Sequence, residues 1–580
     1  MVRKVKDKEL IALTIIMLGV ILIIGLYNLP NEKVIYITSD ELGYWAAAAH
    51  FAKLDWSGVS SMWPYYAYGY GMLLAPIYMI TKNGVWVYRI AIILNALFLC
   101  GSFIALNEIG KRMFCNIGKR FILLVSFCIT LYSSSVFFAH MTMTEPLLWF
   151  GFCCFALLML NIIKDPKISN CILSAILLAY LYMVHMRVVV VIISSVMLMV
   201  LLAVTKKIKI KHIIIWSGTL GIFLIISMIL KNDITAALYT NPVLAGGNDY
   251  AAQTDKVVAI FTLEGFRQLC ISILGKIYYL GAASFLLFYW GLWFILKKVK
   301  RYILAIIRKD TKLEGEEYLF LLLTFLGIMA ISAITMMSFG RIDILLYGRY
   351  IEFVMAPILL CGIYELYRNR NRWKLFTIFI IIQISLTFLV FLVLKQWDPE
   401  GLVSPSIIGI YGMFKNNGNV EDKTFEFLVT AKVLAASFGL CFLISKYHMK
   451  RILYTTIGIL GLTCIWVNLG LKPIEDTEGR KEQVDSLAMA EEIKNNNGGD
   501  VIYYVSNEID RNCGYDYTYI AYVQFLLPDR QVKCIDYSEL QSVDKVKYVI
   551  TMSESSSADQ LLESYDLVYS DEFNLFRLKE

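Results

Sequence analysis

The sequence predicts a mainly α-helical polytopic membrane protein with a small C-terminal α/β domain. The chain of 580 residues is 58% hydrophobic and 17% charged, whereas soluble domains are about a quarter charged. Apolar runs close to the roughly 20 residues that a membrane-spanning helix needs recur over residues 1–471. From residue 472 onwards the apolar runs shorten to strand length and alternate with polar segments.

Thirteen apolar runs are expected to cross the membrane. They lie near Leu10–Leu29, Val85–Leu106, Phe121–Phe138, Pro146–Ile163, Ile172–Val184, Val188–Val204, Ile213–Leu230, Ile271–Leu296, Tyr318–Met337, Ile351–Tyr367, Leu375–Leu394, Phe427–Ile444 and Ile452–Leu471. Basic residues precede the first run and fill alternate loops, and basic loops stay in the cytoplasm. We therefore expect a multi-pass plasma-membrane protein with a cytoplasmic N-terminus and an extracytoplasmic C-terminus.

Three longer segments are expected on the outer face, at residues 30–83, 231–268 and 395–424. The first contains Trp63–Gly71, whose density of Trp and Tyr is typical of a bilayer interface. The apolar piece Met72–Ile80 that follows is too short to span, so we interpret it as interfacial or re-entrant.

Residues 472–580 are predicted to form a soluble α/β domain outside the cell. The expected strands are Val501–Val505, Val532–Ile535, Lys547–Thr551 and the pair Leu567–Tyr569 and Leu575–Leu578, with a helix over Tyr515–Leu527. The loops lack a glycine-rich phosphate fingerprint, so no nucleotide site is predicted. Cys513 and Cys534 could form a disulfide there, although nothing in the sequence shows that they are close.

The charge and cysteine patterns exclude two classes of partner. The formal charge of +7 comes from basic residues in short loops between apolar runs, which is not a nucleic-acid-binding pattern. Most of the 12 cysteines lie in or beside apolar runs, and no C-x-x-C or His-rich spacing indicates a structural zinc site. The absence of an N-x-[ST] acceptor favours a bacterial source.

Ionisable residues gather in the segments that this topology places on the outer face. Because such residues are costly at membrane depth, each is a candidate site residue. They are Asp40, Glu41, His140, Glu145, His185, Arg187, Arg341, Asp343, Tyr347, Arg349 and Tyr350. We expect these distant loops to converge into one pocket at the lipid boundary.

The carboxylates have a catalytic and a structural interpretation. Asp40 and Glu41 follow the first span and precede the helical run Trp45–Ala52. A carboxylate held at a membrane face suits proton abstraction from an acceptor beside a lipid-borne substrate. Glu145 precedes Pro146 at the start of the fourth span. In the structural interpretation, these acids only stabilise helix N-termini.

The arginines and tyrosines predict an anion site. Arg349 opens the tenth span between Tyr347 and Tyr350, and a guanidinium at a helix N-terminus binds anions such as a lipid phosphate. Arg187 lies in a tight turn with His185. The alternatives are that Arg187 extends to the membrane surface and that the tyrosines belong to an interfacial aromatic belt.

Three motifs resemble those of the GT-C superfamily of integral membrane glycosyltransferases. Ser39-Asp40-Glu41, Thr144-Glu145-Pro146 and Tyr347-Gly348-Arg349-Tyr350 resemble in particular the branch of protein O-mannosyltransferases and aminoarabinose transferases. This resemblance implies a polyprenyl-phosphate sugar donor and an inverting transfer with Asp40 as the base. Glu145 would be a second carboxylate of the cavity, and Arg187 and Arg349 would face the lipid phosphate.

The acceptor remains open. Protein-mannosylating members carry a His-Pro-Pro-like stretch in the first outer loop, where this chain has Tyr and Gly between Trp63 and Gly71. The acceptor is therefore an extracytoplasmic glycan, lipid or protein. Asp40, Glu41 and Glu145 could hold a divalent cation, but no Asp-x-Asp stands here, so we expect no required metal or other cofactor.

Two other classes of function were considered. A flippase or transporter for lipid-linked glycans would place its ionisable groups near the midplane of discontinuous helices, whereas here they cluster at the outer ends. A non-catalytic scaffold for envelope assembly predicts that substitution of Asp40 has no effect.

Overall fold

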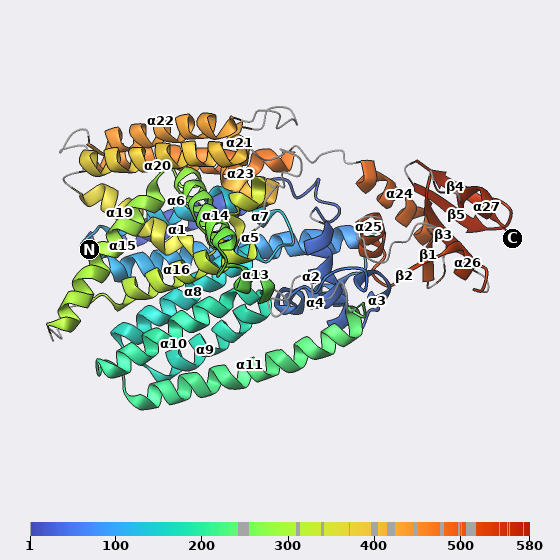
Figure 1. The fold of residues 1–580 in the computed structure, drawn as a ribbon, viewed down its shortest axis with the longest axis horizontal. Coiled ribbons are helices and arrows are strands. Elements are labelled where there is room, and N and C mark those ends of the chain that lie inside the picture. The colour runs from blue at the N-terminus through green and yellow to red at the C-terminus, as the bar shows by residue number, and fades with distance from the viewer. Residues whose placement is uncertain are drawn as a thin grey trace.

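The molecule is an elongated helical bundle with a small sheet domain at one end. A computed structural model describes residues 2–36, 38–241, 254–308, 314–337, 342–369, 372–395, 404–414, 424–445, 451–475, 481–496, 499, 501–505, 518–543, 546–553, 555, 557–571 and 573–579. The N-terminus lies at the end of the bundle that is farthest from the sheet domain, and the C-terminus lies in the sheet domain at the other end of the long axis (Figure 1).

The described residues of the first half of the chain form helices joined by turns and loops. Its elements are α1 (Val2–Gly25), α2 (Thr38–Phe51), α3 (Ser57–Ser60), α4 (Gly69–Ile80), α5 (Gly84–Met113), α6 (Lys119–Thr130), α7 (Ser133–Ala139), α8 (Glu145–Lys164), α9 (Ile168–Val184), η1 (Met186–Val188), α10 (Val189–Val204), α11 (Ile210–Leu238), α13 (Thr254–Ala259) and α14 (Leu263–Ala283).

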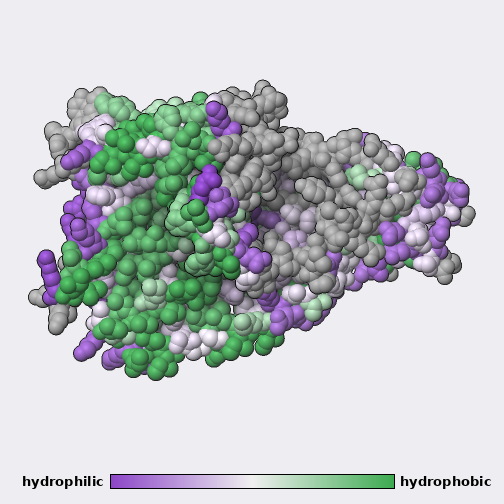
Figure 2. Space-filling view, viewed as in Figure 1, coloured by the Kyte–Doolittle hydropathy of each residue, from purple (hydrophilic) through white to green (hydrophobic). Residues whose placement is uncertain are grey.

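The bundle continues with α15 (Leu287–Ile307), α16 (Glu316–Thr335), α17 (Ile342–Leu345), α18 (Arg349–Glu352), α19 (Met355–Arg368), α20 (Arg372–Leu394), η3 (Ser404–Ile407), α21 (Ile408–Phe414), α22 (Phe425–Ser445) and α23 (Arg451–Glu475). Within the described residues, nine helices are long and apolar enough to cross a membrane, or up to 12 if each of three bent pairs is one span. A broad hydrophobic surface lies on the face of the bundle seen in Figure 2, as a multi-pass membrane protein requires. The count of thirteen spans stays a prediction.

Three of the predicted spans contain a bend, of 58°, 88° and 111°, and the sharpest lies near Phe285. The sequence predicted a single span over Ile271–Leu296, but α14 and α15 meet there at 111°. Phe285 and Leu286 at the break have left-handed backbone conformations, with φ of 51° and 63°. Two consecutive left-handed residues cannot continue a right-handed helix, so α14 ends and α15 departs in a new direction.

The first outer segment folds into short helices that pack closely on one another. The helical run predicted after Asp40 is confirmed, and Ala46–Ala49 of α2 are fully buried. The piece Met72–Ile80 lies in α4, which has 12 residues and packs against α2. The expected outer loop 395–424 is partly helical instead, because the apolar residues of α21 are buried against α23.

The C-terminal domain contains one mixed sheet. Its elements are α24 (Lys481–Asn495), β1 (Val501–Val505), α25 (Thr518–Leu526), β2 (Gln531–Ile535), α26 (Tyr537–Leu540), β3 (Tyr548–Met552), α27 (Ser557–Leu561), β4 (Tyr565–Ser570) and β5 (Phe573–Leu578). The strand order is β2-β1-β3-β5-β4. β1 pairs in parallel with β2 and β3, and β5 pairs antiparallel with β3 and β4. All five predicted strands are confirmed. Cys534 is a free thiol, and Cys513 lies outside the described residues.

Helix α25 docks this domain onto the first outer segment. The indole of Trp56 donates a hydrogen bond to the carbonyl of Pro528 at 3.0 Å, and the rings of Trp45 and Phe525 pack edge to face at 5.4 Å. Residues more than 450 positions apart in the chain are thus in direct contact. The C-terminal domain therefore supports α2, the helix that carries Asp40.

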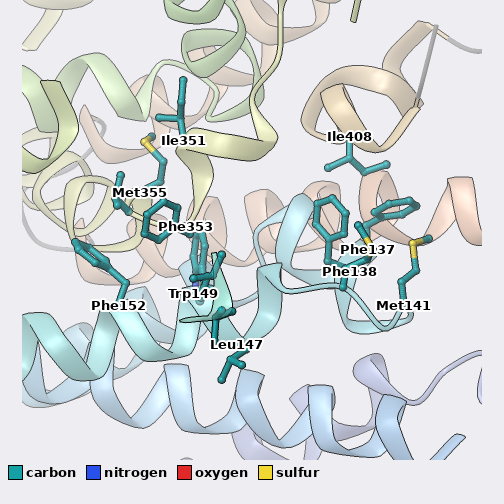
Figure 3. Packing of buried hydrophobic residues seen from close by; sticks show 14 of the residues in the cluster. Phe137, Phe138, Met141, Leu147, Trp149, Phe152, Ile351, Phe353, Met355 and Ile408 are labelled. Carbon is teal, nitrogen blue, oxygen red and sulfur yellow. The ribbon is translucent and has the colours of Figure 1, made fainter. Parts of the chain in front are cut away.

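A buried apolar cluster joins the helices that follow Glu145 and Arg349. Figure 3 shows Trp149 and Phe152 of α8 beside Phe353 and Met355. The rings of Phe152 and Phe353 make an edge-to-face contact at 5.7 Å. Burial of this surface fixes the two chain segments side by side, so the polar residues that precede them are also brought together.

Candidate functional site

Four charged side chains from four distant segments form one continuous chain of ion pairs. Arg349 Nη1 donates to Asp40 Oδ2 at 2.6 Å, and Arg349 Nε donates to Glu145 Oε1 at 2.8 Å. Arg187 Nη2 donates to the same oxygen of Glu145 at 3.2 Å. The order is therefore Asp40, Arg349, Glu145, Arg187, so residues from four of the expected outer segments are in direct contact.

The cluster runs from a buried end to a more exposed end. The side chain of Arg187 is 0% exposed, those of Glu145 and Arg349 are each 8% exposed, and that of Asp40 is 20% exposed. The alternative that Arg187 extends to the membrane surface is thus wrong. The charges of the two carboxylates balance those of the two guanidinium groups. Buried charged side chains in proteins are normally paired in this way. Asp40 is the member that an incoming molecule reaches most easily.

Helix starts position both acids. Asp40 lies in the first turn of α2 and Glu145 in the first turn of α8, where Pro146 occupies an early helical position. The structural interpretation of these acids is therefore also met, since carboxylates favour helix N-termini. Ion pairing and helix stabilisation coexist at the same residues.

A glycine lets an aromatic residue reach Asp40. Tyr66 donates its hydroxyl to Asp40 Oδ1 at 2.9 Å. Its ring lies across α2 at Gly43, where a Cβ atom would be only 2.3 Å from the ring. Burial, and then the charge of Asp40, raise the pKa of Tyr66 well above its ordinary value. The hydroxyl therefore stays protonated at neutral pH and remains a hydrogen-bond donor.

Aromatic rings line the guanidinium groups. The Arg187 guanidinium lies 4.8 Å from the ring centre of Tyr350 and 5.2 Å from that of Phe353, within the range of cation–π attraction. The rings of Tyr347 and Tyr350 are in contact at 4.9 Å. His185 packs on Tyr350 at 5.3 Å, and its Nδ1 accepts a hydrogen bond from the backbone N–H of Arg187.

Arg187 keeps unused hydrogen-bonding capacity. Its Nε and Nη1 atoms are buried and have no hydrogen-bond partner within the described part of the chain. Buried donors without a partner are costly, and few native groups are left in this state.

Glu41 belongs to a separate cluster, which corrects its expected catalytic role. Its carboxylate is fully buried and accepts hydrogen bonds from the backbone N–H groups of Tyr36 and Thr142 and from the hydroxyls of Tyr88 and Thr142. A carboxylate has about four lone-pair positions, so four donors leave little capacity for a substrate proton. Glu41 instead ties α2 to the segment that leads to Glu145.

His140 lies away from the ion-pair cluster, and Arg341 lies outside the residues that the structure describes. His140 is buried beside α1, where its Nε2 lies 3.1 Å from the carbonyl of Ile24 and its Nδ1 lies 3.6 Å from Glu32. Its expected substrate-binding role is thus not supported by its position.

The acids do not gather into a metal site. Within the ranges that the structure describes, no group of three or more His, Cys, Asp or Glu side chains could hold a metal ion. Asp40 and Glu145 are each paired with Arg349, and Glu41 is hydrogen-bonded elsewhere. All three carboxylates are thus engaged by protein donors among the described residues.

Sequence reasoning missed Tyr66 and Phe138. Tyr66 lies in the aromatic stretch that predicted a bilayer interface, and nothing in its spacing shows that it folds back onto Gly43. Phe138 places its ring 5.7 Å from the Arg349 guanidinium, although it was expected inside the third span. The sequence offered one signal for Phe138: it is the last residue of the third predicted span, at the expected outer end, and Glu145 follows shortly after it in the chain.

The fold matches that of known membrane enzymes. No protein-family model and no curated protein matches the sequence. ArnT from Cupriavidus metallidurans bound to undecaprenyl phosphate has 13% sequence identity and a TM-score of 0.53, covering 97% of this chain and 98% of that chain. Apo ArnT from the same organism has 13% identity, a TM-score of 0.52 and 97% coverage of both chains. The chain therefore has the GT-C fold that its three short motifs predict.

Proposed function

We propose that the protein is a membrane glycosyltransferase that moves a sugar from a polyprenyl-phosphate donor to an extracytoplasmic acceptor in a bacterial plasma membrane. The observation that carries this proposal is the ion-pair chain, which runs from a partly exposed carboxylate, Asp40, to a buried guanidinium, Arg187, whose Nε and Nη1 have no hydrogen-bond partner among the described residues. The fold shared with ArnT, solved with undecaprenyl phosphate, supports the same assignment.

The two ends of the ion-pair chain, Asp40 and Arg187, have different roles in the proposed reaction. The acceptor oxygen or nitrogen attacks the anomeric carbon, and Asp40 takes its proton. The bond between that carbon and the phosphate oxygen breaks, and its electron pair stays on the polyprenyl phosphate. Arg187 and Arg349 stabilise the negative charge that grows there. Attack from the face opposite the phosphate inverts the anomeric centre.

The remaining polar residues complete the proposed site. His185 and Tyr350 contact Arg187, and Tyr347 contacts Tyr350. These three residues are proposed to contact the phosphate and the sugar. We propose that no metal is required, because Arg349 and Arg187 together neutralise Asp40 and Glu145. The sugar and the acceptor are left unassigned.

The first prediction is that Asp40→Asn abolishes transfer. The amide keeps the shape of the carboxylate but cannot accept the proton, and general-base catalysis typically contributes about 100-fold or more. The measurement is release of free polyprenyl phosphate by mass spectrometry, with protein in liposomes supplied with polyprenyl-linked sugars and acceptors extracted from the host envelope. The assay is run with and without EDTA.

The matched control is Asp233→Asn. Asp233 is an outer-segment carboxylate whose side chain is 67% exposed and contacts His50, and this variant should keep full activity. Full activity of Asp40→Asn would refute the base assignment. Transport of the intact lipid-linked sugar without release of polyprenyl phosphate would instead identify a flippase.

A further inference from the structure

A cavity of about 350 Å³ lies at the end of the bundle opposite the ion-pair cluster. It is lined by Phe294, Lys297, Lys298, Arg301, Tyr364, Glu365, Arg368 and Asn369 of α15 and α19 and the residue that follows α19. The 14-residue helix α19 begins just after Arg349 and ends at Arg368, so about 20 Å of helix separates the two sites. In Figure 2 hydrophilic residues border the hydrophobic surface at this end.

The lining of the cavity is strongly basic. Four cationic side chains face one carboxylate, and that carboxylate is already engaged, since Glu365 pairs with Lys297 and accepts a hydrogen bond from Asn369 at 2.7 Å. The positive-inside bias accounts for basic residues at helix ends. It does not account for a concave space between them, and such a space with convergent cations indicates an anionic ligand.

Aromatic rings make the walls of the cavity rigid. Phe294 contacts Tyr364 at 5.3 Å, and Tyr364 stacks on Phe114 at 4.0 Å. The ammonium of Lys298 lies 5.6 Å from the ring centre of Phe294 and 5.5 Å from that of Tyr318. These contacts hold the stem of Lys298 in place, so its charge is positioned before a ligand arrives.

Exposed apolar side chains on α15 indicate that the anionic ligand is part of a lipid. Trp293 and Leu296, immediately before the cavity residues in sequence, are 39% and 44% exposed. Exposed apolar side chains on a membrane helix face lipid chains, and Lys297 lies over the ring of Trp293 at 5.9 Å. A molecule with an anionic head and apolar chains could therefore fill the cavity and cover this helix surface together.

We propose that this cavity binds the headgroup of an anionic phospholipid in the leaflet opposite the sugar-transfer site. Lys298 and Arg301 contact the phosphate, while Lys297 remains paired with Glu365. The acyl chains lie along Trp293 and Leu296. This site is independent of the proposed transfer reaction, and it assigns a role to residues that the reaction does not use.

The test is native mass spectrometry of the purified protein with phosphatidylglycerol, phosphatidylcholine or inorganic phosphate. The double substitution Lys298→Gln and Arg301→Gln should weaken phosphatidylglycerol binding roughly 10- to 30-fold, since it removes the two charges that contact the lipid phosphate in the cavity. The matched control removes the same charge by Lys300→Gln on α15 and Arg308→Gln directly after it, at two exposed residues that do not line the cavity. The control should bind like the unmodified chain.

Two results would overturn the proposal. Equal loss of phosphatidylglycerol from both double variants would show that the charges attract lipid without a site. Equal binding of inorganic phosphate and phosphatidylglycerol would show that the cavity holds a soluble anion rather than a lipid.

Discussion

At the residue scale, the site depends on the geometry of arginine. One guanidinium, that of Arg349, contacts Asp40 through Nη1 and Glu145 through Nε, and these partners are 309 and 204 positions away in the chain. A planar group with five fixed donors can serve two carboxylates at once, whereas the single ammonium of lysine cannot reproduce that fork. The same planarity lets Arg187 lie against Tyr350 while it binds Glu145.

Tyr66 supplies a prediction at this scale. Tyr66→Phe should lower kcat about 10-fold or more and leave the KM for the lipid donor nearly unchanged. The hydroxyl orients Asp40, and hydrogen bonds to charged groups are worth about 1.5–3 kcal/mol. Gly43→Ala should reproduce this loss, because the new methyl group displaces the Tyr66 ring. Steady-state kinetics in the polyprenyl phosphate assay measures both effects.

The control for Tyr66 is Tyr78→Phe. Tyr78 is also buried in the first outer segment, but its hydroxyl has no hydrogen-bond partner within the described part of the chain. This variant should retain its kcat. If Tyr66→Phe and Tyr78→Phe behave alike, the hydroxyl of Tyr66 does not position Asp40.

At the element scale, the outer helices and the C-terminal domain act as one support for α2. Phe525 of α25 is fully buried between Trp45 and Tyr88, at ring distances of 5.4 and 5.9 Å. Tyr88 in turn donates a hydrogen bond to Glu41 at 3.0 Å. Removal of one aromatic ring on α25 is therefore transmitted to the helix that carries the proposed base.

Phe525→Ala should lower both stability and activity. The loss of a buried phenyl ring costs about 3–5 kcal/mol, and a shift of α2 moves Asp40 from its position beside Arg349. Thermal inactivation in detergent and the transfer assay measure the two effects. Leu567→Ala, on the exposed edge strand β4 of the same domain, removes a side chain that is 44% exposed and should change stability by only about 0.5 kcal/mol. Unchanged activity in Phe525→Ala would contradict the coupling.

At the scale of the whole molecule, the two termini lie at opposite ends of the bundle (Figure 1). This arrangement agrees with an odd number of crossings. The basic cavity lies at one end and the ion-pair cluster lies at the end that faces the sheet domain. If positively charged loops are cytoplasmic, the sheet domain and Asp40 are outside.

Cysteine labelling of intact cells tests this orientation. In a chain with Cys513→Ser and Lys579→Cys, a membrane-impermeant maleimide should label position 579 at once. Cys115, an exposed thiol between α5 and α6, should react only after the membrane is opened. Cys534 should remain silent, because burial raises its pKa to about 12 and suppresses the reactive thiolate. The reverse pattern for 579 and 115 would mean an inverted topology.

The sequence by itself determined the class of the molecule and much of its outline. Apolar runs of spanning length, alternating strand patterns after residue 500 and the ionisable residues at helix starts are local features, and local features depend on periodicity and composition. For that reason the helices, all five strands and Asp40, Glu145, Arg187 and Arg349 could be identified without coordinates. The bend at Phe285 and Leu286 could not, because neither residue type normally adopts a left-handed conformation.

Only the tertiary structure decided which charged residues share a site. Asp40 and Glu41 are adjacent in sequence, yet a helix turns successive side chains by about 100°, so one reaches Arg349 and the other reaches Thr142. Tyr66 and Phe525 joined the support of α2 through contacts between distant segments that no spacing encodes. Packing between helices selects such partners, and packing is a property of the folded surface rather than of any single segment.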